Sequence, residues 1–184
     1  MSKVAIFMAD GCEEIEGLTV VDILRRVGIE IDMVSVTGKR MVTSSHRVSF
    51  ETDILFEEAD FAGYDAVVLP GGMPGTTHLL EHEGVVRTAK EFNEAGKLVA
   101  AICAAPSVLG LNHLLEGKKA TCHPGFEDKL LGAIPVEEPV VLDSNIITSR
   151  GMGTAIEFAL AIVEYLEDKE KVEKVKTSLV YRGW

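Results

Sequence analysis

The stretch that decides the fold is residues 97–107, which read Lys97-Leu98-Val99-Ala100-Ala101-Ile102-Cys103-Ala104-Ala105-Pro106-Ser107. The apolar run over 98–102 predicts a buried strand, and the pattern after it predicts a helix from about Ala104. Cys103 stands between the two and is therefore expected on a sharp turn that faces the helix N-terminus. Unpaired backbone N–H groups and the helix dipole favour a thiolate there. The alternative is a buried structural cysteine, since free cysteines are among the most buried residues.

Apolar strands and helices alternate along the chain on both sides of this stretch. Strands are expected over 4–8, 31–36, 66–70, 98–102 and around 120–122, with a hairpin pair over 140–142 and 146–148. Helices are expected over 14–27, 84–94, from 104, over 154–166 and over 167–176, and residues 41–55 indicate a short antiparallel excursion. The helix over 154–166 is expected to open with a capping box at Thr154 and Glu157. We therefore predict one α/β domain over residues 1–184, with a mostly parallel sheet and helices on both faces.

The composition is that of an acidic globular protein. Of 184 residues, 47% are hydrophobic and 26% are charged, and the net charge is −11. This charge argues against nucleic acid or an anionic membrane as a partner. No apolar stretch reaches the roughly 18 residues that a membrane span needs, and no leader pattern precedes the first strand. Three cysteines argue against a disulfide framework and for the cytoplasm, and no CxxC or HExxH spacing indicates a metal site.

Four segments leave the predicted strands at their carboxyl ends, where open α/β sheets bind ligands. They are residues 9–14, 70–75, 103–106 and 122–125. All four are rich in glycine, proline or titratable side chains. We therefore expect them to converge on one site.

Several motifs, taken together, resemble a known superfamily. They are Glu16 within EEIE at 13–16, VLPGG at 68–72, AAICAAP at 100–106, His123-Pro124, and TSRG at 148–151. Their order along nearly the whole chain is similar to the ThiJ/PfpI superfamily. Within it, the chain resembles the branch of the Parkinsonism-associated protein deglycase and its bacterial relatives named for thiazole biosynthesis. The resemblance implies a flavodoxin-like three-layer sandwich that forms a homodimer and works without a cofactor.

The resemblance also implies a reactive Cys103 and a protonated carboxylic acid, Glu16, in contact with its sulfur. Backbone N–H groups of Gly71, Gly72 and Ala104 would complete an anion hole. The chemistry agrees, because a carboxyl buried against a thiolate keeps its proton and donates a hydrogen bond to sulfur. That bond and the helix-end amides can supply the roughly 4 kcal/mol needed to lower a thiol pKa from about 8.5 to about 5–6. Without the resemblance, Glu16 reads as an exposed carboxylate at a helix start.

His123 enters as a neighbour of Cys103, either as a general base or as a loop donor. The peptidase branch of the superfamily carries histidine directly after the cysteine, whereas Ala104 stands here, so peptidase activity is not expected. No GxSxG elbow supports a serine triad. Gly71-Gly72 is a weak sign of nucleotide binding, since neither a P-loop lysine nor GxGxxG accompanies it.

Two further cysteines lie in segments expected near the site. Cys12 is in the first strand-end loop, and Cys122 directly precedes His123. Either one is a candidate to resolve an oxidised Cys103 as a disulfide. The alternative is that both are small structural residues.

The predicted helix over 14–27 carries apolar residues on more than one face, namely Ile15, Leu18, Val20, Val21, Ile23, Leu24 and Val27. A surface helix needs only one apolar stripe. The excess indicates a dimer interface, as in the superfamily, or burial by a neighbouring loop.

Two classes of function use the same site. In the first, the Cys103 thiolate attacks an α-oxoaldehyde or its protein adduct, Glu16 moves protons with or without His123, and water releases lactate or glycolate. In the second, the thiolate is an oxidation sensor that controls a partner contact or a chaperone function. We favour the enzyme, because a pocket that holds an activated nucleophile and an acid is costly to keep for sensing alone.

Overall fold

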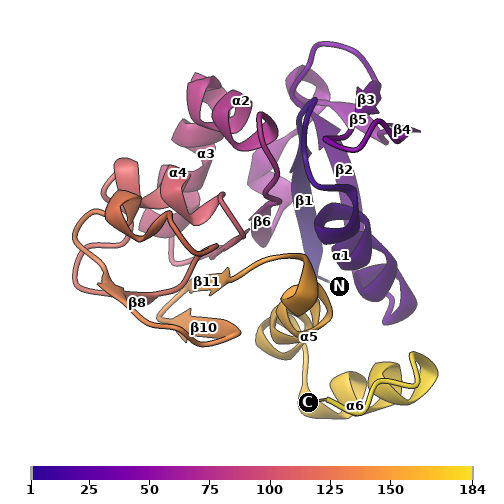
Figure 1. The fold of residues 1–184 in the computed structure, drawn as a ribbon. Coiled ribbons are helices and arrows are strands. Elements are labelled where there is room, and N and C mark those ends of the chain that lie inside the picture. Colours follow the sequence, from indigo (N-terminus) through magenta and orange to yellow (C-terminus); the bar gives the residue numbers. More distant parts are fainter. Residues whose placement is uncertain (1, 184) are drawn as a thin grey trace.

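The computed structural model describes residues 2–183 and is built around a seven-stranded sheet (Figure 1). The strand order is β10-β11-β7-β6-β1-β2-β5. The strands are β1 (Lys3–Met8), β2 (Glu30–Ser35), β5 (Ile54–Leu55), β6 (Ala66–Leu69), β7 (Leu98–Ile102), β10 (Val140–Asp143) and β11 (Ile146–Ser149). Neighbouring strands are parallel except β10 and β11, which form the predicted hairpin. The mostly parallel sheet confirms the predicted fold class.

Helices cover both faces of this sheet and make a three-layer sandwich (Figure 1). One layer holds α1 (Glu14–Arg26), α5 (Ala155–Leu166) and α6 (Lys169–Ser178), and the other holds α2 (Gly75–Glu81), α3 (Glu83–Glu94) and α4 (Pro106–Leu111). Side chains of β1 alternate between the two layers, with Ile6 packed among residues of α1 and α5 and Phe7 among residues of α3 and α4. Burial on both faces explains the continuous apolar runs of the strands.

Helix α1 is buried by a helix of its own chain. It packs against α5, and Val20, Val21, Ile23 and Leu24 are all buried there. Among its large apolar side chains, Ile15 stands out as 48% exposed. Most of the apolar excess that the sequence suggested for a dimer interface is therefore accounted for within the chain, by a helix rather than by a loop. No described helix has the length and apolar character that crossing a membrane requires.

Two small sheets lie outside the main one. The pair β3 (Met41–Thr43) and β4 (Ser49–Glu51) is antiparallel and forms most of the excursion predicted over 41–55. The end of that segment departs from the prediction, because Ile54–Leu55 joins the main sheet as β5, parallel to β2. The pair β8 (Lys119–Ala120) and β9 (Ile134–Pro135) is parallel. The strand expected around 120–122 is therefore not a member of the main sheet. The segment after it contacts the turn after β7 through the backbone bond from His123 N–H to Cys103 O.

Two local expectations are wrong, and one helix was not predicted. The helix after Cys103 begins at Pro106 rather than Ala104, because residues 103–105 form a turn. Helix α2 was not predicted; it follows directly on the glycine-rich segment after β6. No capping box opens α5: the Thr154 hydroxyl donates to Gly151 O (2.9 Å), while Glu157 accepts from the Tyr181 hydroxyl (2.7 Å).

Candidate active site

Cys103 sits on the predicted sharp turn directly after β7. Its φ of +65° lies in the left-handed region, which costs a non-glycine residue about 1–3 kcal/mol and is typical of functional positions. Its backbone is fully engaged: the N–H donates to Ser149 O (3.0 Å), and the carbonyl accepts from the His123 N–H (2.7 Å). The turn is thereby fixed between β11 and the loop after β8, with the side chain half-buried.

The sulfur of Cys103 accepts hydrogen bonds from two of the three expected backbone N–H groups. These belong to Gly72 and Ala104. The third, Gly71 N–H, donates instead to Glu16 Oε2 at 2.9 Å. The anion hole predicted from Gly71, Gly72 and Ala104 is therefore divided, with two amides on the sulfur and one on the carboxyl.

Glu16 lies in the first turn of α1 and is 1% exposed, so the alternative reading of a solvated helix-start carboxylate does not hold. The side chain of Glu13 caps the helix by accepting from Glu16 N–H (2.7 Å). The Glu16 carboxyl is hydrogen-bonded with the Cys103 thiol. Its Oε1 is buried and has no hydrogen-bond partner among the described residues. An acceptor oxygen left unpaired in this way is suited to a proton or to a bound donor.

Gly71 permits this close approach. A Cβ at Gly71 would lie 2.5 Å from Cys103 Cβ and 2.7 Å from Glu16 Oε2. Side chains do not pack at such distances, so glycine is required for Cys103 and Glu16 to meet. The sequence identified Gly71 as part of the site, but it could not identify this steric role.

The electrostatics of the pair differ from the sequence expectation. Burial raises the pKa of the Glu16 carboxyl from 4.5 to about 7, against hydrogen bonds from Cys103 and Gly71 that lower it. Burial and the neighbouring Glu16 charge raise the pKa of the Cys103 thiol to about 12, although the amides of Gly72 and Ala104 lower it. The expected lowering of the thiol pKa therefore requires Glu16 to keep its proton, since protonation turns the repulsion into a donated hydrogen bond.

His123 borders the site from the exposed side. Its ring Nδ1 lies 3.0 Å from Pro124 O, and its backbone N–H donates to Cys103 O. No hydrogen bond joins its ring to Cys103 or Glu16 within residues 2–183. The structure thus brings His123 to the site, as predicted, without forming a Cys–His dyad.

Cys12 and Cys122 are both almost completely buried, with exposed fractions of 0% and 1%. Burial, followed by the charge of Glu14, raises the pKa of Cys12 to about 12, and burial, followed by the charge of Glu127, raises that of Cys122 to about 11. They belong to different cores, and all three cysteines are free. Their surroundings favour the structural reading of both residues.

Two groups near the site were missed by sequence reasoning. The His46 Nδ1 lies 3.3 Å from Glu14 Oε2 and 3.9 Å from Glu13 Oε1. His46 is more than 30 residues from these glutamates in the sequence, so no local pattern indicated the contact. Gly151 belongs to a motif that the sequence singled out, but it received no role. A Cβ there would be in contact with Cys103, Glu16 and His123 together.

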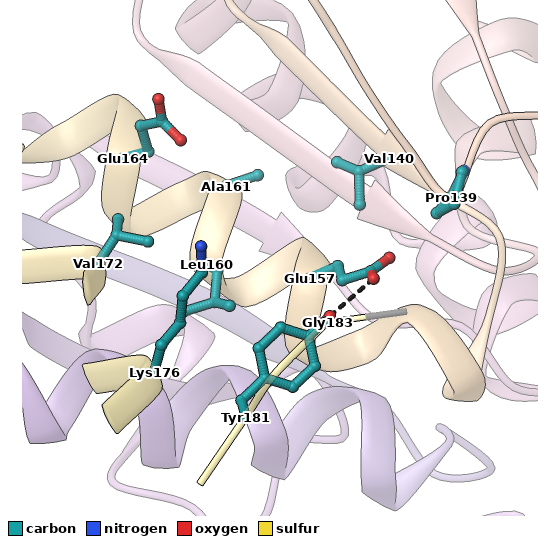
Figure 2. Close-up of a pocket in the computed structure, with 10 residues that line it drawn as sticks. All are labelled: Pro139, Val140, Glu157, Leu160, Ala161, Glu164, Val172, Lys176, Tyr181 and Gly183. Atoms are coloured by element: carbon teal, nitrogen blue, oxygen red, sulfur yellow. Dashed lines mark hydrogen bonds between the residues drawn. The ribbon is translucent and has the colours of Figure 1, made fainter. Parts of the chain in front are cut away.

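A groove of about 420 Å³ lies elsewhere, between β10, α5, α6 and the C-terminal segment (Figure 2). Figure 2 shows the Tyr181 hydroxyl bonded to Glu157 beside it. None of the predicted site residues lines this groove. It therefore has no part in the chemistry of Cys103.

The chain is similar to known proteins over most of its length. Residues 2–165 match the model of the DJ-1/PfpI family. Protein DJ-1 homolog B of Arabidopsis thaliana is 40% identical over 182 residues, which are 98% of this chain but only 42% of that protein, so the chain spans less than half its length. Glutathione-independent glyoxalase DJR-1.2 of Caenorhabditis elegans is 32% identical over 176 residues, which are 95% of this chain and 93% of that protein.

Solved structures agree with the sequence matches. The structure described as oxidized Toxoplasma gondii DJ-1 has a TM-score of 0.95 and 36% sequence identity, and the match covers 100% of both chains. This match confirms the flavodoxin-like fold that the resemblance implied.

Proposed function

The chain belongs to the DJ-1/PfpI family, and we propose that it is a cysteine-dependent, cofactor-independent glyoxalase or deglycase acting on α-oxoaldehydes or their protein adducts. The observation that carries the proposal is the pairing of the Cys103 thiol with a buried Glu16 carboxyl whose Oε1 is unpaired. This pairing provides a nucleophile and a proton carrier at one point. A relative of similar length is named as a glutathione-independent glyoxalase, which supports a reaction that uses the protein's own thiol.

The first step is addition of sulfur to the aldehyde carbon. The Cys103 thiolate, whose proton has passed to solvent, forms a bond from Sγ to that carbon, the C=O π bond opens, and the oxygen takes the proton that Glu16 holds. The product is a hemithioacetal, and Glu16 is left as a carboxylate. The Gly72 and Ala104 amides, which hold the sulfur in place, orient it for attack.

The second step is an internal redox exchange that needs no external oxidant. The Glu16 carboxylate removes the C–H proton of the hemithioacetal, and the hydroxyl proton passes to the oxygen of the adjacent carbonyl. The C–H proton then returns to the carbon that bears this oxygen. The former aldehyde carbon is oxidised to a thioester while its neighbour is reduced to an alcohol. Water then cleaves the C–S bond and restores the thiol. Methylglyoxal and one water thus give lactate, and glyoxal gives glycolate.

We assign His123 to the entry side of this site, where its exposed ring can carry protons between solvent and the reacting oxygen. In a deglycase reaction the same addition would begin from the adduct of the aldehyde with a protein amine or thiol. Peptidase activity is not proposed, because Ala104 occupies the position directly after Cys103.

The alternative function is an oxidation sensor or a redox-regulated chaperone. Its supporting observation is the half-buried sulfur held by two amides and next to a carboxyl that can donate, which is a suitable setting for a sulfinate. A structural relative is described as oxidized. The two functions share the thiol and differ in whether turnover occurs.

The deciding experiment measures lactate formed from methylglyoxal without glutathione. The wild type is expected to produce lactate, Cys103→Ser to lose at least about a hundredfold in rate, and Cys122→Ala to remain near the wild type. Equal rates in the wild type and Cys103→Ser would reject the enzyme. A wild type that forms no lactate yet oxidises at Cys103 under peroxide would instead favour the sensor.

The assembly proposed is a homodimer in the cytoplasm. Three free cysteines are consistent with a reducing compartment. Exposed Ile15 and Ile156 line an apolar groove with Leu18 and Leu179, and a second copy of the chain would cover them. No nucleic acid or membrane partner is proposed for a chain with net charge −11.

A further inference from the structure

Gly151 marks a small open space in front of the reactive sulfur. It follows β11, and a Cβ built on it would lie 4.0 Å from Cys103 Sγ, 3.8 Å from Glu16 Oε1 and 3.6 Å from His123 Cδ2. These three groups come from the turn after β7, from α1 and from the loop after β8. All three border the position that a Gly151 Cβ would occupy, and glycine leaves this position without a side chain.

Folding does not require glycine at this position. Gly151 has φ 161° and ψ −167°, which is extended backbone that any residue adopts. The three distances are ordinary van der Waals contacts, so an alanine would fit without displacing a neighbour. Gly71 differs in this respect, because a Cβ there would collide with Cys103 and Glu16. Neither the backbone conformation nor the packing around residue 151 therefore requires glycine there.

A second observation indicates what the space receives. Glu16 is 1% exposed, and its Oε1 is buried without a hydrogen-bond partner among the described residues. That oxygen lies 3.8 Å from the position a Gly151 Cβ would take. A buried acceptor in this state is satisfied by a donor group of a bound molecule. The hydroxyl of a thiol adduct at Sγ would be such a donor.

We propose that Gly151 is a specificity-determining residue, which leaves room above the Cys103 sulfur for the carbon substituent of an α-oxoaldehyde. The inference rests on the proposed function and names its substrate class: aldehydes whose adjacent carbonyl carries a methyl or larger group. When sulfur bonds to the aldehyde carbon, that carbon becomes tetrahedral and carries a hydroxyl, a hydrogen and the acyl group. With the hydroxyl at Glu16 Oε1, the acyl group lies at Gly151.

Gly151→Ala tests this with Gly153→Ala as its matched control. Gly153 is two residues away, and a Cβ there would meet nothing within 4 Å. In Gly151→Ala, kcat/KM is expected to fall about tenfold or more for methylglyoxal and phenylglyoxal, and less than about threefold for glyoxal, which has hydrogen in place of the substituent. Gly153→Ala should match the wild type on all three aldehydes. An equal loss on all three, or no loss, would overturn the proposal.

A readout independent of turnover separates this inference from the proposed function. Peptide mass spectrometry follows Cys103 as it reacts with hydrogen peroxide and with N-ethylmaleimide. Gly151→Ala should slow the reaction of Cys103 with the maleimide about tenfold and change its oxidation by peroxide less than about twofold. The added methyl group occupies space that the maleimide needs and that the smaller peroxide does not. A wild type inert toward all three aldehydes rejects the proposed function, and the maleimide-to-peroxide ratio then still decides the role of Gly151. An unchanged ratio in Gly151→Ala overturns that role.

Discussion

At the scale of single residues, Glu16 holds the proton on which both proposed functions depend. Burial raises its pKa to about 7 in the folded protein, from an ordinary 4.5. An unfolded chain releases this proton at lower pH, so between these values the folded state binds more protons. The free energy of unfolding therefore falls as the pH rises from about 4.5 to about 7 and levels off above that.

The size of this effect makes it measurable. Raising the pKa of Glu16 from 4.5 to about 7 corresponds to about 3 kcal/mol, at about 1.36 kcal/mol for each pKa unit. Glu16→Gln removes the titration and keeps a donor toward sulfur. Urea unfolding across this pH range should show the wild type losing about 3 kcal/mol relative to Glu16→Gln. Parallel curves for the two proteins would show that Glu16 is not protonated by burial.

The residues also show where sequence reasoning ended. The sharp turn at Cys103 was predicted from an apolar strand that ends in a run of small residues. The contact between Cys103 and Glu16 was predicted only from the resemblance to the superfamily, since the local pattern favoured an exposed Glu16. The direction in which the pKa of the Cys103 thiol moves was not predicted correctly. It depends on how the amides of Gly71, Gly72 and Ala104 are divided between Cys103 and Glu16, and on the charge of Glu16. Neither the sharing nor the burial of Glu16 is visible in a local pattern.

At the scale of elements, the site depends on the segment after β6 lying directly against the turn after β7. Gly71→Ala would place a Cβ 2.5 Å from Cys103 Cβ and 2.7 Å from Glu16 Oε2. We expect a loss of about 1–3 kcal/mol in the free energy of unfolding, as for other overpacked positions, together with a slower reaction of Cys103 with iodoacetamide. Gly63→Ala is the control, because a Cβ there would meet nothing within 4 Å. Equal stability and reactivity in the two variants would contradict the packing role of Gly71.

The long strands of the main sheet were predictable, whereas the pairing of the short strands β5 and β8 was not. Strands buried on both faces carry continuous apolar runs, as in Val4–Met8 and Ala66–Leu69, so their positions along the chain follow from the sequence. The strand near Cys122 is short because it pairs only with β9, and it reaches the site through the bond from His123 N–H to Cys103 O. The capping box predicted at Thr154 does not form, because the Thr154 hydroxyl donates to the Gly151 carbonyl. The spacing of residues in the sequence does not show this interaction.

At the scale of the whole molecule, charge and apolar surface oppose each other in the proposed dimer. The net charge of −11 on each copy repels a second copy. The groove of about 320 Å³ lined by Ile15, Leu18 and Ile156 favours association by removing apolar surface from water. Added salt screens the repulsion and leaves the apolar contact intact. The dimer should therefore become tighter as the salt concentration rises.

Ile156→Glu separates these two contributions. Ile156 is 39% exposed in the first turn of α5, where a carboxylate suits the helix dipole and leaves the fold intact. In the groove of a dimer the same charge would be buried without a partner, which disfavours association strongly. Sedimentation equilibrium should give twice the chain mass of 19.9 kDa for the wild type and the single mass for Ile156→Glu. Leu142→Glu, at a residue 54% exposed on β10, should stay dimeric. A wild type that sediments at the single mass at every salt concentration would contradict the proposed dimer.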